Sequence, residues 1–124
     1  MKLLLDTHAA LWFLAGDDRL SEAAGRHLTD VSNRVLLSAA VVWEIAIKRG
    51  LGTLVVPDEY LSLLLSAGVT PLAVSVEHTA AVEQLPPHHR DPFDRMLVAQ
   101  ASLEGAALVS GDPALRRYDI PLIW

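Results

Sequence analysis

The sequence predicts an α/β fold, a single domain in which a central, mostly parallel sheet of four to five strands is flanked by helices. Short apolar runs without polar alternation recur along the chain, as in strands that are covered on both faces. The stretches between these runs have the composition and length of helices. A chain of 124 residues is long enough for one hydrophobic core and too short for two ordinary ones, so we expect one domain over residues 1–124.

Five apolar runs are the expected strands. None of them shows the alternation of apolar and polar residues that marks a strand with one solvated face. A parallel sheet buried between layers of helices therefore fits them best. In chain order the runs are Leu3–Leu5, Val35–Leu37, Leu72–Val74, Ala107–Val109 and a last one near Pro121–Ile123.

Helices are expected between these strands, several with recognisable first or last residues. Ser21 and Ser38 are candidate N-caps, and the helix that Ser38 starts should end at Gly50. Asp91 followed by Pro92 has the form of an N-cap and a first helical residue. The expected helices are 21–28, 38–50, 57–67, 74–85 and one that begins at Asp91.

Composition narrows the classes of function. The chain has no cysteine, which excludes disulfides and thiolate sites, so a metal ion would need oxygen or imidazole ligands. The formal net charge of −5 argues against a surface that binds nucleic acid by bulk electrostatics alone, although local basic patches are compatible with it. No apolar run approaches the length of a membrane span, and the N-terminus lacks a signal-peptide core. We therefore expect a cytoplasmic protein without a membrane partner.

Polar residues follow directly or closely after three of the expected strands. Asp6 ends the first apolar run, Ser38 follows the second, and Asp112 comes shortly after the fourth. In an open parallel sheet, ligands bind beyond the carboxyl ends of the strands, where loops and helix N-termini converge. We therefore expect these side chains to share one edge of the sheet.

Glu44 is a carboxylate within AAVVWEIAI, a helical segment whose other residues are all apolar. A buried charge is unfavourable unless it is paired, neutralised or bound to a metal. We therefore predict that Glu44 belongs to the same site. The alternative is a surface ion pair with Lys48 one helical turn later, which would stabilise the helix by only roughly 0.3 kcal/mol.

Asp91, Asp94 and Asp112 each have a simpler interpretation as well. Asp91 at an N-cap and Asp94 one turn later would both complement the positive end of the helix dipole. Asp112 precedes Pro113 and so has the same form of a cap followed by proline. Taken one by one, these acids do not distinguish a capping role from a functional one.

Gathered at one edge, these carboxylates predict a divalent cation. Two carboxylates about 5 Å apart repel each other by roughly 3 kcal/mol at an effective dielectric constant of about 20. A cluster of them therefore favours protonation or a bound cation. Oxygen ligands suit Mg²⁺ or Mn²⁺, which would leave coordination positions for phosphate oxygens and an attacking water. Phosphodiester hydrolysis is the chemistry that this arrangement indicates.

The histidines and aromatic residues give weaker signals. His8 is not expected to be a ligand, because neighbours at a strand end point in different directions from Asp6. His88 and His89 lie in a proline-bounded loop, where we expect solvent exposure or an interface. No aromatic run resembles a nucleic-acid binding signature. We expect core or subunit contacts, rather than base stacking, for Trp12, Phe13 and Trp43.

Four separated segments, in this order, resemble the PIN-domain ribonucleases and specifically the VapC-type toxins of bacterial toxin–antitoxin pairs. Each segment carries the acid that the family places there: Asp6, Glu44, Asp94 and Asp112. The similarity runs nearly from end to end of the chain. The segments are LLLDTHAALWFL, SAAVVWEIAIKRG, HRDPFDRMLVAQA and LVSGDPAL.

The same resemblance identifies supporting residues. Ser110 matches a hydroxyl residue that the family places two positions before the last acid, and Thr7 matches a polar position beside the first. Asp91 belongs to the RDPFDR form found in part of the family. Gly111 is a small departure from the family pattern.

The resemblance implies a Mg²⁺- or Mn²⁺-dependent endoribonuclease, the toxin of a type II pair, which forms a homodimer and is inhibited by a cognate antitoxin. On this reading Asp6, Asp94 and Asp112 hold the cation, and Glu44 binds a second ion or orients the attacking water. RNA would be cut to 5′-phosphate and 3′-hydroxyl ends.

Two other functions are consistent with acids at strand ends. One is a phosphoryl-transfer domain of receiver or phosphatase type. Such domains carry a second acid beside the first or two residues after it, whereas here Asp6 is followed by Thr7 and His8. The other is a non-catalytic interaction module, in which the acids cap helices and bind a basic segment of a partner. Specific uptake of manganese would distinguish a nuclease site from the capping-only module.

Overall fold

The structure, a computed structural model, describes residues 1–124 and confirms the α/β fold. One sheet of five strands has the order β3-β2-β1-β4-β5. Every neighbouring pair of strands is parallel. The strands are β1 (Lys2–Leu5), β2 (Arg34–Ser38), β3 (Thr70–Leu72), β4 (Ala107–Val109) and β5 (Leu122–Ile123).

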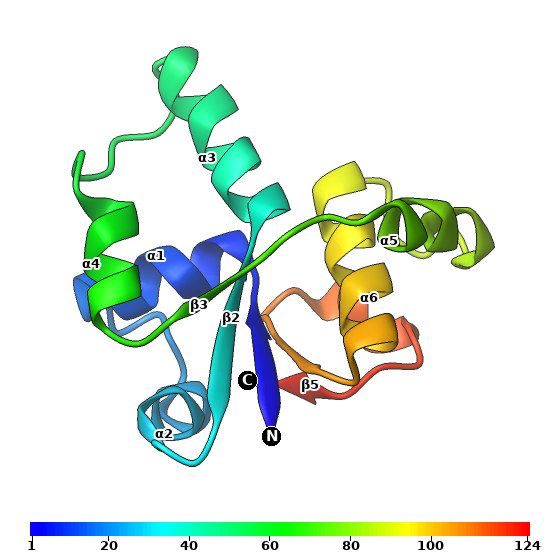
Figure 1. Cartoon of the computed structure of the whole chain (residues 1–124), viewed down its shortest axis with the longest axis horizontal. Helices are drawn as coiled ribbons and strands as arrows, with labels where there is room; N and C mark the ends of the chain where they lie inside the picture. Colours follow the sequence, from blue (N-terminus) through cyan, green and yellow to red (C-terminus); the bar gives the residue numbers. More distant parts are fainter.

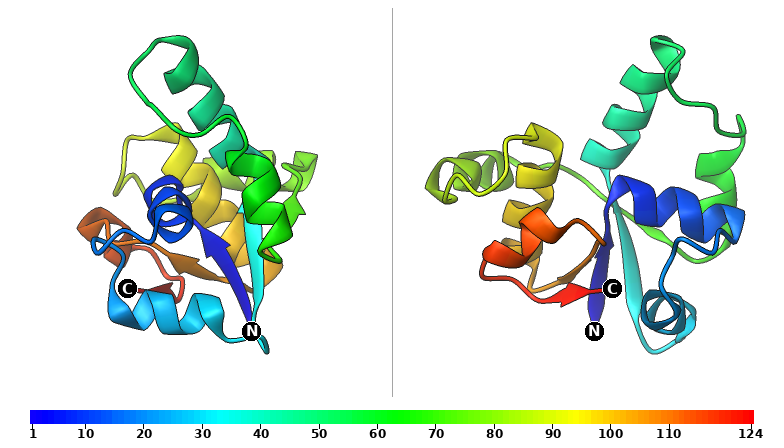
Figure 2. Two further views of the ribbon diagram at one scale, coloured as in Figure 1. Left: turned by 90° about the vertical axis from the view of Figure 1, so that its left-hand side faces the viewer. Right: turned by 180° about the vertical axis from the view of Figure 1, so that it is seen from behind.

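Helices cover the sheet on both sides. In Figure 1, α1, α2 and α4 gather on one side of β1 and β2, while α5 and α6 lie on the other. Helix α3 continues from the end of β2, and both panels of Figure 2 show it projecting beyond the strands. None of the helices is both long and apolar enough to cross a membrane. The helices are α1 (Thr7–Ala15), α2 (Glu22–Thr29), α3 (Ala39–Gly50), α4 (Tyr60–Ser66), α5 (Val76–Ala81) and α6 (Pro92–Glu104), with 3-10 turns η1 (Val82–Gln84) and η2 (Pro113–Arg117).

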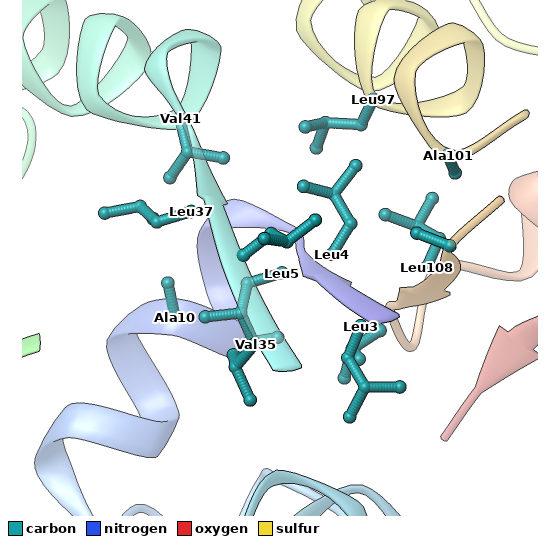
Figure 3. Close-up of a cluster of buried hydrophobic side chains, with 14 of the residues drawn as sticks. Leu3, Leu4, Leu5, Ala10, Val35, Leu37, Val41, Leu97, Ala101 and Leu108 are labelled. Carbon is teal, nitrogen blue, oxygen red and sulfur yellow. The ribbon is translucent and has the colours of Figure 1, made fainter. Parts of the chain in front are cut away.

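Strand β1 lies at the centre of the core. Leu3–Leu5 are completely buried, because this strand is covered on both faces and each successive side chain finds an apolar layer. Figure 3 shows them surrounded by Ala10 of α1, Val41 of α3, Leu97 of α6 and Leu108 of β4. Burying one leucine stabilises the fold by about 2 kcal/mol, so this strand is a rigid base for the residue that follows it.

The order of the strands reverses beside β1. From β1 the chain runs outward through β2 to β3, then returns to place β4 on the other side of β1 and β5 beyond it. The Asp6 amide still donates to the Val109 carbonyl oxygen at 3.1 Å, after which the two chains separate. A doubly wound sheet binds ligands at such a reversal, because the loops that leave the two strands diverge there.

The predicted helix caps at Ser21, Ser38 and Asp91 are confirmed. The side chain of each accepts a hydrogen bond from a backbone amide in the first turn of its helix. Ser38 is fully buried, and its hydroxyl accepts from the Ala40 amide at 3.0 Å.

Strand β3 was predicted at Leu72–Val74 but spans Thr70–Leu72. Its position is set by pairing with β2, in which Thr70 lies opposite Leu36. It is an edge strand and only partly buried, so Thr70 and Pro71 are tolerated in it, and apolar character does not mark its bounds.

Helix α1 was not predicted. It begins directly after β1, with Asp6 as its N-cap, and ends at Gly16 in the left-handed conformation at φ 63°. Because one residue both ends the strand and caps the helix, no linker or change of composition separates the two elements. Other helices are shorter than predicted: 57–67 contains α4, and 74–85 contains α5 and η1.

Candidate functional site

A cavity of about 570 Å³ opens at the carboxyl ends of β1 and β4. All four acids predicted for the site line it, as do two of the three supporting residues, Thr7 and Asp91. The third, Ser110, is buried and does not line the cavity. The carboxylates that line the cavity are those of Asp6, Glu44, Asp91, Asp94 and Asp112.

Asp6 is held at the tip of the central strand. Its Oδ1 accepts a hydrogen bond from the Ala9 amide at 2.7 Å, and the residue is only 6% exposed. Burial raises the pKa of Asp6, and the Ser110 hydroxyl and the Ala9 amide offset only part of that effect. The carboxylate is thus rigidly positioned and short of positive partners.

Glu44 has two partners on opposite oxygens. The Thr7 hydroxyl donates to Oε1, which links α1 to α3, and the Lys48 ammonium lies 2.8 Å from Oε2. The ion pair with Lys48 that we considered as an alternative is therefore present, yet it is not a surface pair, because the Glu44 side chain is 9% exposed. Hydrogen bonding to Glu44 raises the pKa of Lys48, which stays cationic beside the cavity.

Asp94 lies in the first turn of α6 and faces the other acids. Burial raises its pKa to about 7, and the negative charge of Asp91 adds to that increase. Asp91 acts as the cap that we considered, since its Oδ1 accepts from the Phe93 amide at 2.8 Å and the Asp94 amide at 3.3 Å. It therefore both caps α6 and lines the cavity.

Asp112 caps the turn η2, with Oδ1 accepting from the Ala114 amide at 3.0 Å. Its own amide donates to the Ser110 hydroxyl oxygen at 3.1 Å. Burial alone would raise the pKa of Asp112, but hydrogen bonds from His89 and the Ala114 amide hold it below its ordinary value.

His89 is the residue that sequence reasoning missed. We expected it in solvent or at an interface, but its side chain is 17% exposed, and Nε2 lies 2.8 Å from Asp112 Oδ2 and 3.2 Å from Asp94 Oδ2. Its Nδ1 accepts from the Asp91 amide at 3.0 Å, which places the proton of the neutral ring on Nε2. The only sequence signal is its place just before the cap of an acid-bearing helix.

The donor set fits a hard divalent cation. One ligand atom from each of His89, Asp94 and Asp112 lies within 4.8 Å of the others. Because Nε2 of His89 carries a proton, this ring donates a hydrogen bond to Asp112, and only the carboxylate oxygens would be free to bind an ion. Burial raises the pKa values of both Asp6 and Asp94, and a bound cation would favour their ionised forms.

The remaining wall of the cavity carries aromatic and cationic side chains. Gly111, a departure from the family pattern, has a structural reason: a Cβ built there would lie 2.6 Å from Cε2 of Trp124. The glycine therefore lets the Trp124 indole lie against the loop that carries Asp112. The other members of this wall are His8, Trp12, Arg19 and Lys48.

Comparison with known proteins agrees with the fold and the motifs. The family model of the PIN domain matches residues 3–121. Ribonuclease VapC22 of Mycobacterium tuberculosis is 31% identical over 127 residues, which cover 96% of this chain and 93% of that protein.

Solved structures of low sequence identity share the fold. A chain of VapBC2 from Rickettsia felis, solved bound to a DNA fragment from their promoter, superposes with a TM-score of 0.72 at 16% identity and covers 98% of this chain and 97% of its own. VapC20 of Mycobacterium tuberculosis, described as a Sarcin-Ricin loop cleaving toxin, has a TM-score of 0.59 at 19% identity over 94% of this chain and 95% of its own. The chain belongs to the PIN-domain family and, within it, to the VapC-type proteins.

Proposed function

We propose that this protein is a metal-dependent endoribonuclease, the toxin of a type II toxin–antitoxin pair. It would hydrolyse RNA phosphodiester bonds to 5′-phosphate and 3′-hydroxyl ends. The observation that carries the proposal is the convergence of Asp6, Glu44, Asp94 and Asp112, from four separate segments, on one cavity at the reversal of the sheet. Similarity to a protein named Ribonuclease VapC22 supports the choice of RNA as substrate.

Mg²⁺ or Mn²⁺ is the proposed cofactor. Asp6, Asp94 and Asp112 would hold the ion directly or through water, and Glu44 would bind a second ion or orient the nucleophilic water. When bound, the cation supplies Lewis-acid polarisation of the phosphate and neutralises charge on the departing 3′ oxygen.

The side chains around the acids position them for this reaction. Thr7 and Lys48 hold the two oxygens of Glu44, so its carboxylate is oriented before substrate arrives. His89 donates from Nε2 toward Asp112 and Asp94 and keeps these two carboxylates side by side. Asp94 must be ionised to act as a ligand, so its raised pKa predicts that protons compete with the cation and that more metal is needed for activity below about pH 7 than above it.

The proposed partners follow from the same site. Five carboxylates line one cavity, where they could bind a basic side chain of an antitoxin. The similarity of the fold to structures of VapBC complexes supports such a partner. We also propose a homodimer and a cytoplasmic location, as the family resemblance and the sequence suggest.

A non-catalytic interaction module is the second candidate, because Asp6, Asp91 and Asp112 all cap helices or turns. Capping accounts for these three residues. It does not account for Glu44, which lies in the middle of a helix, or for Asp94, whose pKa is raised by burial among acids. The proposed nuclease gives both of these residues a role.

The direct test is cleavage of RNA by the purified chain without antitoxin, in Mg²⁺ or Mn²⁺ and in EDTA. We expect cleavage only with the metal, and a loss of about 100-fold or more in Asp6→Asn. Asp18→Asn, at an exposed acid that does not line the cavity, is the matched control and should cleave like the parent. Cleavage that survives both EDTA and Asp6→Asn would reject the proposal.

A further inference from the structure

Helix α1 presents an aromatic stack to the cavity that holds the acids. His8 and Trp12 are one helical turn apart, and their rings are stacked with centroids 5.2 Å apart and an interplanar angle of 12°. The Trp124 ring lies 5.8 Å from that of Trp12. The Arg19 guanidinium lies over the Trp12 ring at 4.9 Å from its centroid. All four side chains line the cavity, so they form one wall of it, which we call the aromatic wall.

Trp12 does not belong to the hydrophobic core, which was one of the two roles, core or subunit contact, that we expected for it. Its neighbours Leu11, Phe13 and Leu14 pack against the hydrophobic core, whereas Trp12 does not. His8, which stacks on it, is exposed to solvent. The stack therefore adds little to the core and has surface free to extend toward a ligand.

Arg19 is held in place with one donor group free. Its Nε and Nη2 bind the Asp17 carboxylate at 3.1 and 2.8 Å, and no hydrogen bond of the protein uses Nη1. Its side chain is 69% exposed. Apart from Lys48, which is paired with Glu44, Arg19 is the cation that lines this acidic cavity. Such an oriented guanidinium can meet a phosphate oxygen without rearrangement.

The aromatic wall begins beside the proposed reacting centre. His8 follows Asp6 by two residues at the start of α1, and it lines the same cavity as Asp6 and Asp112. If the phosphate of a nucleotide bound at the acids, the base of that nucleotide or of the next one would therefore lie beside the His8–Trp12 stack. Proteins recognise single-stranded RNA by stacking unpaired bases on aromatic rings and on arginine.

We propose that His8, Trp12 and Arg19 form a subsite for one unpaired nucleotide next to the scissile phosphate. The base extends the His8–Trp12 stack, and Nη1 of Arg19 donates to the adjoining phosphate. The subsite rests on the proposed function, because it takes RNA as the substrate. It adds that the substrate must be single-stranded where it is cut.

The test measures binding rather than cleavage. Affinity for a fluorescein-labelled, short single-stranded RNA of random sequence is compared with affinity for an abasic strand of the same length, by fluorescence anisotropy in Mg²⁺. An Asp94→Asn background slows cleavage and removes one repulsive charge. We expect His8→Ala to weaken RNA binding about 5- to 50-fold and to leave abasic binding unchanged, because only RNA offers a base to stack. Arg19→Ala should weaken the binding of both strands, and His8→Phe should bind RNA as tightly as the background protein.

Matched controls are His27→Ala and Arg26→Ala on α2, which lie outside the cavity and should bind like the background protein. For His8→Ala, equal losses of affinity on the RNA and the abasic strand, or RNA binding that matches the controls, would overturn the subsite. Failure of the parent protein to cleave RNA would overturn the proposed function instead. The two failures are therefore distinguishable.

Discussion

At the scale of single residues, capping and function use the same side chains. Asp6, Asp91 and Asp112 each accept a backbone amide hydrogen through one oxygen, which leaves the other oxygen directed elsewhere. A cap thus fixes the orientation of a carboxylate at a helix N-terminus, where the dipole favours negative charge. This is why sequence patterns could not separate the two roles for these residues: both are present at once.

The raised pKa of Asp94 predicts how stability depends on pH in the metal-free protein. The folded-state pKa is about 7, above the unfolded value, so the folded state binds this proton more tightly. That stabilisation is fully present below about pH 4 and is lost as the pH rises through about 7. We expect the midpoint temperature of thermal unfolding, measured in EDTA, to decrease as the pH is raised from 5 to 8.

Asp94→Asn should remove much of this pH dependence. At pH 8 the variant should be more stable by about 1 kcal/mol, discounted for the partial exposure of the group, or by roughly 4 °C in midpoint. The variant should also lose RNA cleavage, because Asp94 lowers the stability of the protein at this pH but is needed for activity. Thermal unfolding at both pH values checks this, and an unchanged slope in the variant would contradict it.

Thr7 tests whether the orientation of Glu44 matters. Thr7→Val keeps the shape of the side chain but removes the hydroxyl that donates to Glu44. We expect RNA cleavage to fall about 10-fold, as for other partners of metal-binding carboxylates, with little change in overall structure. Thr29→Val on α2, whose hydroxyl binds only backbone carbonyls, is the control. Equal activity in both variants would show that Thr7 does not orient Glu44.

At the scale of elements, the sequence predicted best what is buried. Continuous apolar runs located β1, β2 and β4 closely, because these strands are covered on both faces. The edge strand β3 was misplaced by two residues, since pairing with β2 rather than burial sets its position. Helix α1 was missed because Asp6 ends a strand and caps a helix without an intervening turn.

The loop after β4 predicts a specific steric effect. In Gly111→Ala the new methyl group would meet the Trp124 indole, so this ring must shift from its present position in the aromatic wall. We expect a loss of about 1 kcal/mol in unfolding free energy, the low end for overpacking, because a ring can shift more easily than backbone. Gly25→Ala on α2, which meets open space, should instead stabilise the protein by about 0.5 kcal/mol or more. Urea unfolding measures both, and equal effects of the two substitutions would contradict the contact.

At the scale of the whole molecule, topology assembles the site. Asp6 and Asp112 come from the two strands at the reversal of the sheet, Glu44 from α3, and Asp94 from α6. Strand-end residues and motif acids could be predicted from the sequence because their positions follow from local pattern. The positions of His89 and of the aromatic wall could not be predicted. They depend on how the loop before α6 and helix α1 are placed relative to the acids in the folded protein.

Since four segments bring like charges together, a bound cation should stabilise the entire fold. A ligand present at about 100 times its dissociation constant raises the unfolding free energy by about 2.7 kcal/mol. We therefore expect Mn²⁺ to raise the thermal midpoint of the parent and of Asp18→Asn, and to have a much smaller effect on Asp6→Asn and Asp112→Asn. Isothermal titration should give the same ranking of affinities. If Mn²⁺ left the thermal midpoint of the parent unchanged, the interaction module would be the better description of this cavity. If Mn²⁺ stabilised Asp6→Asn as much as the parent, Asp6 would not be a ligand of the ion.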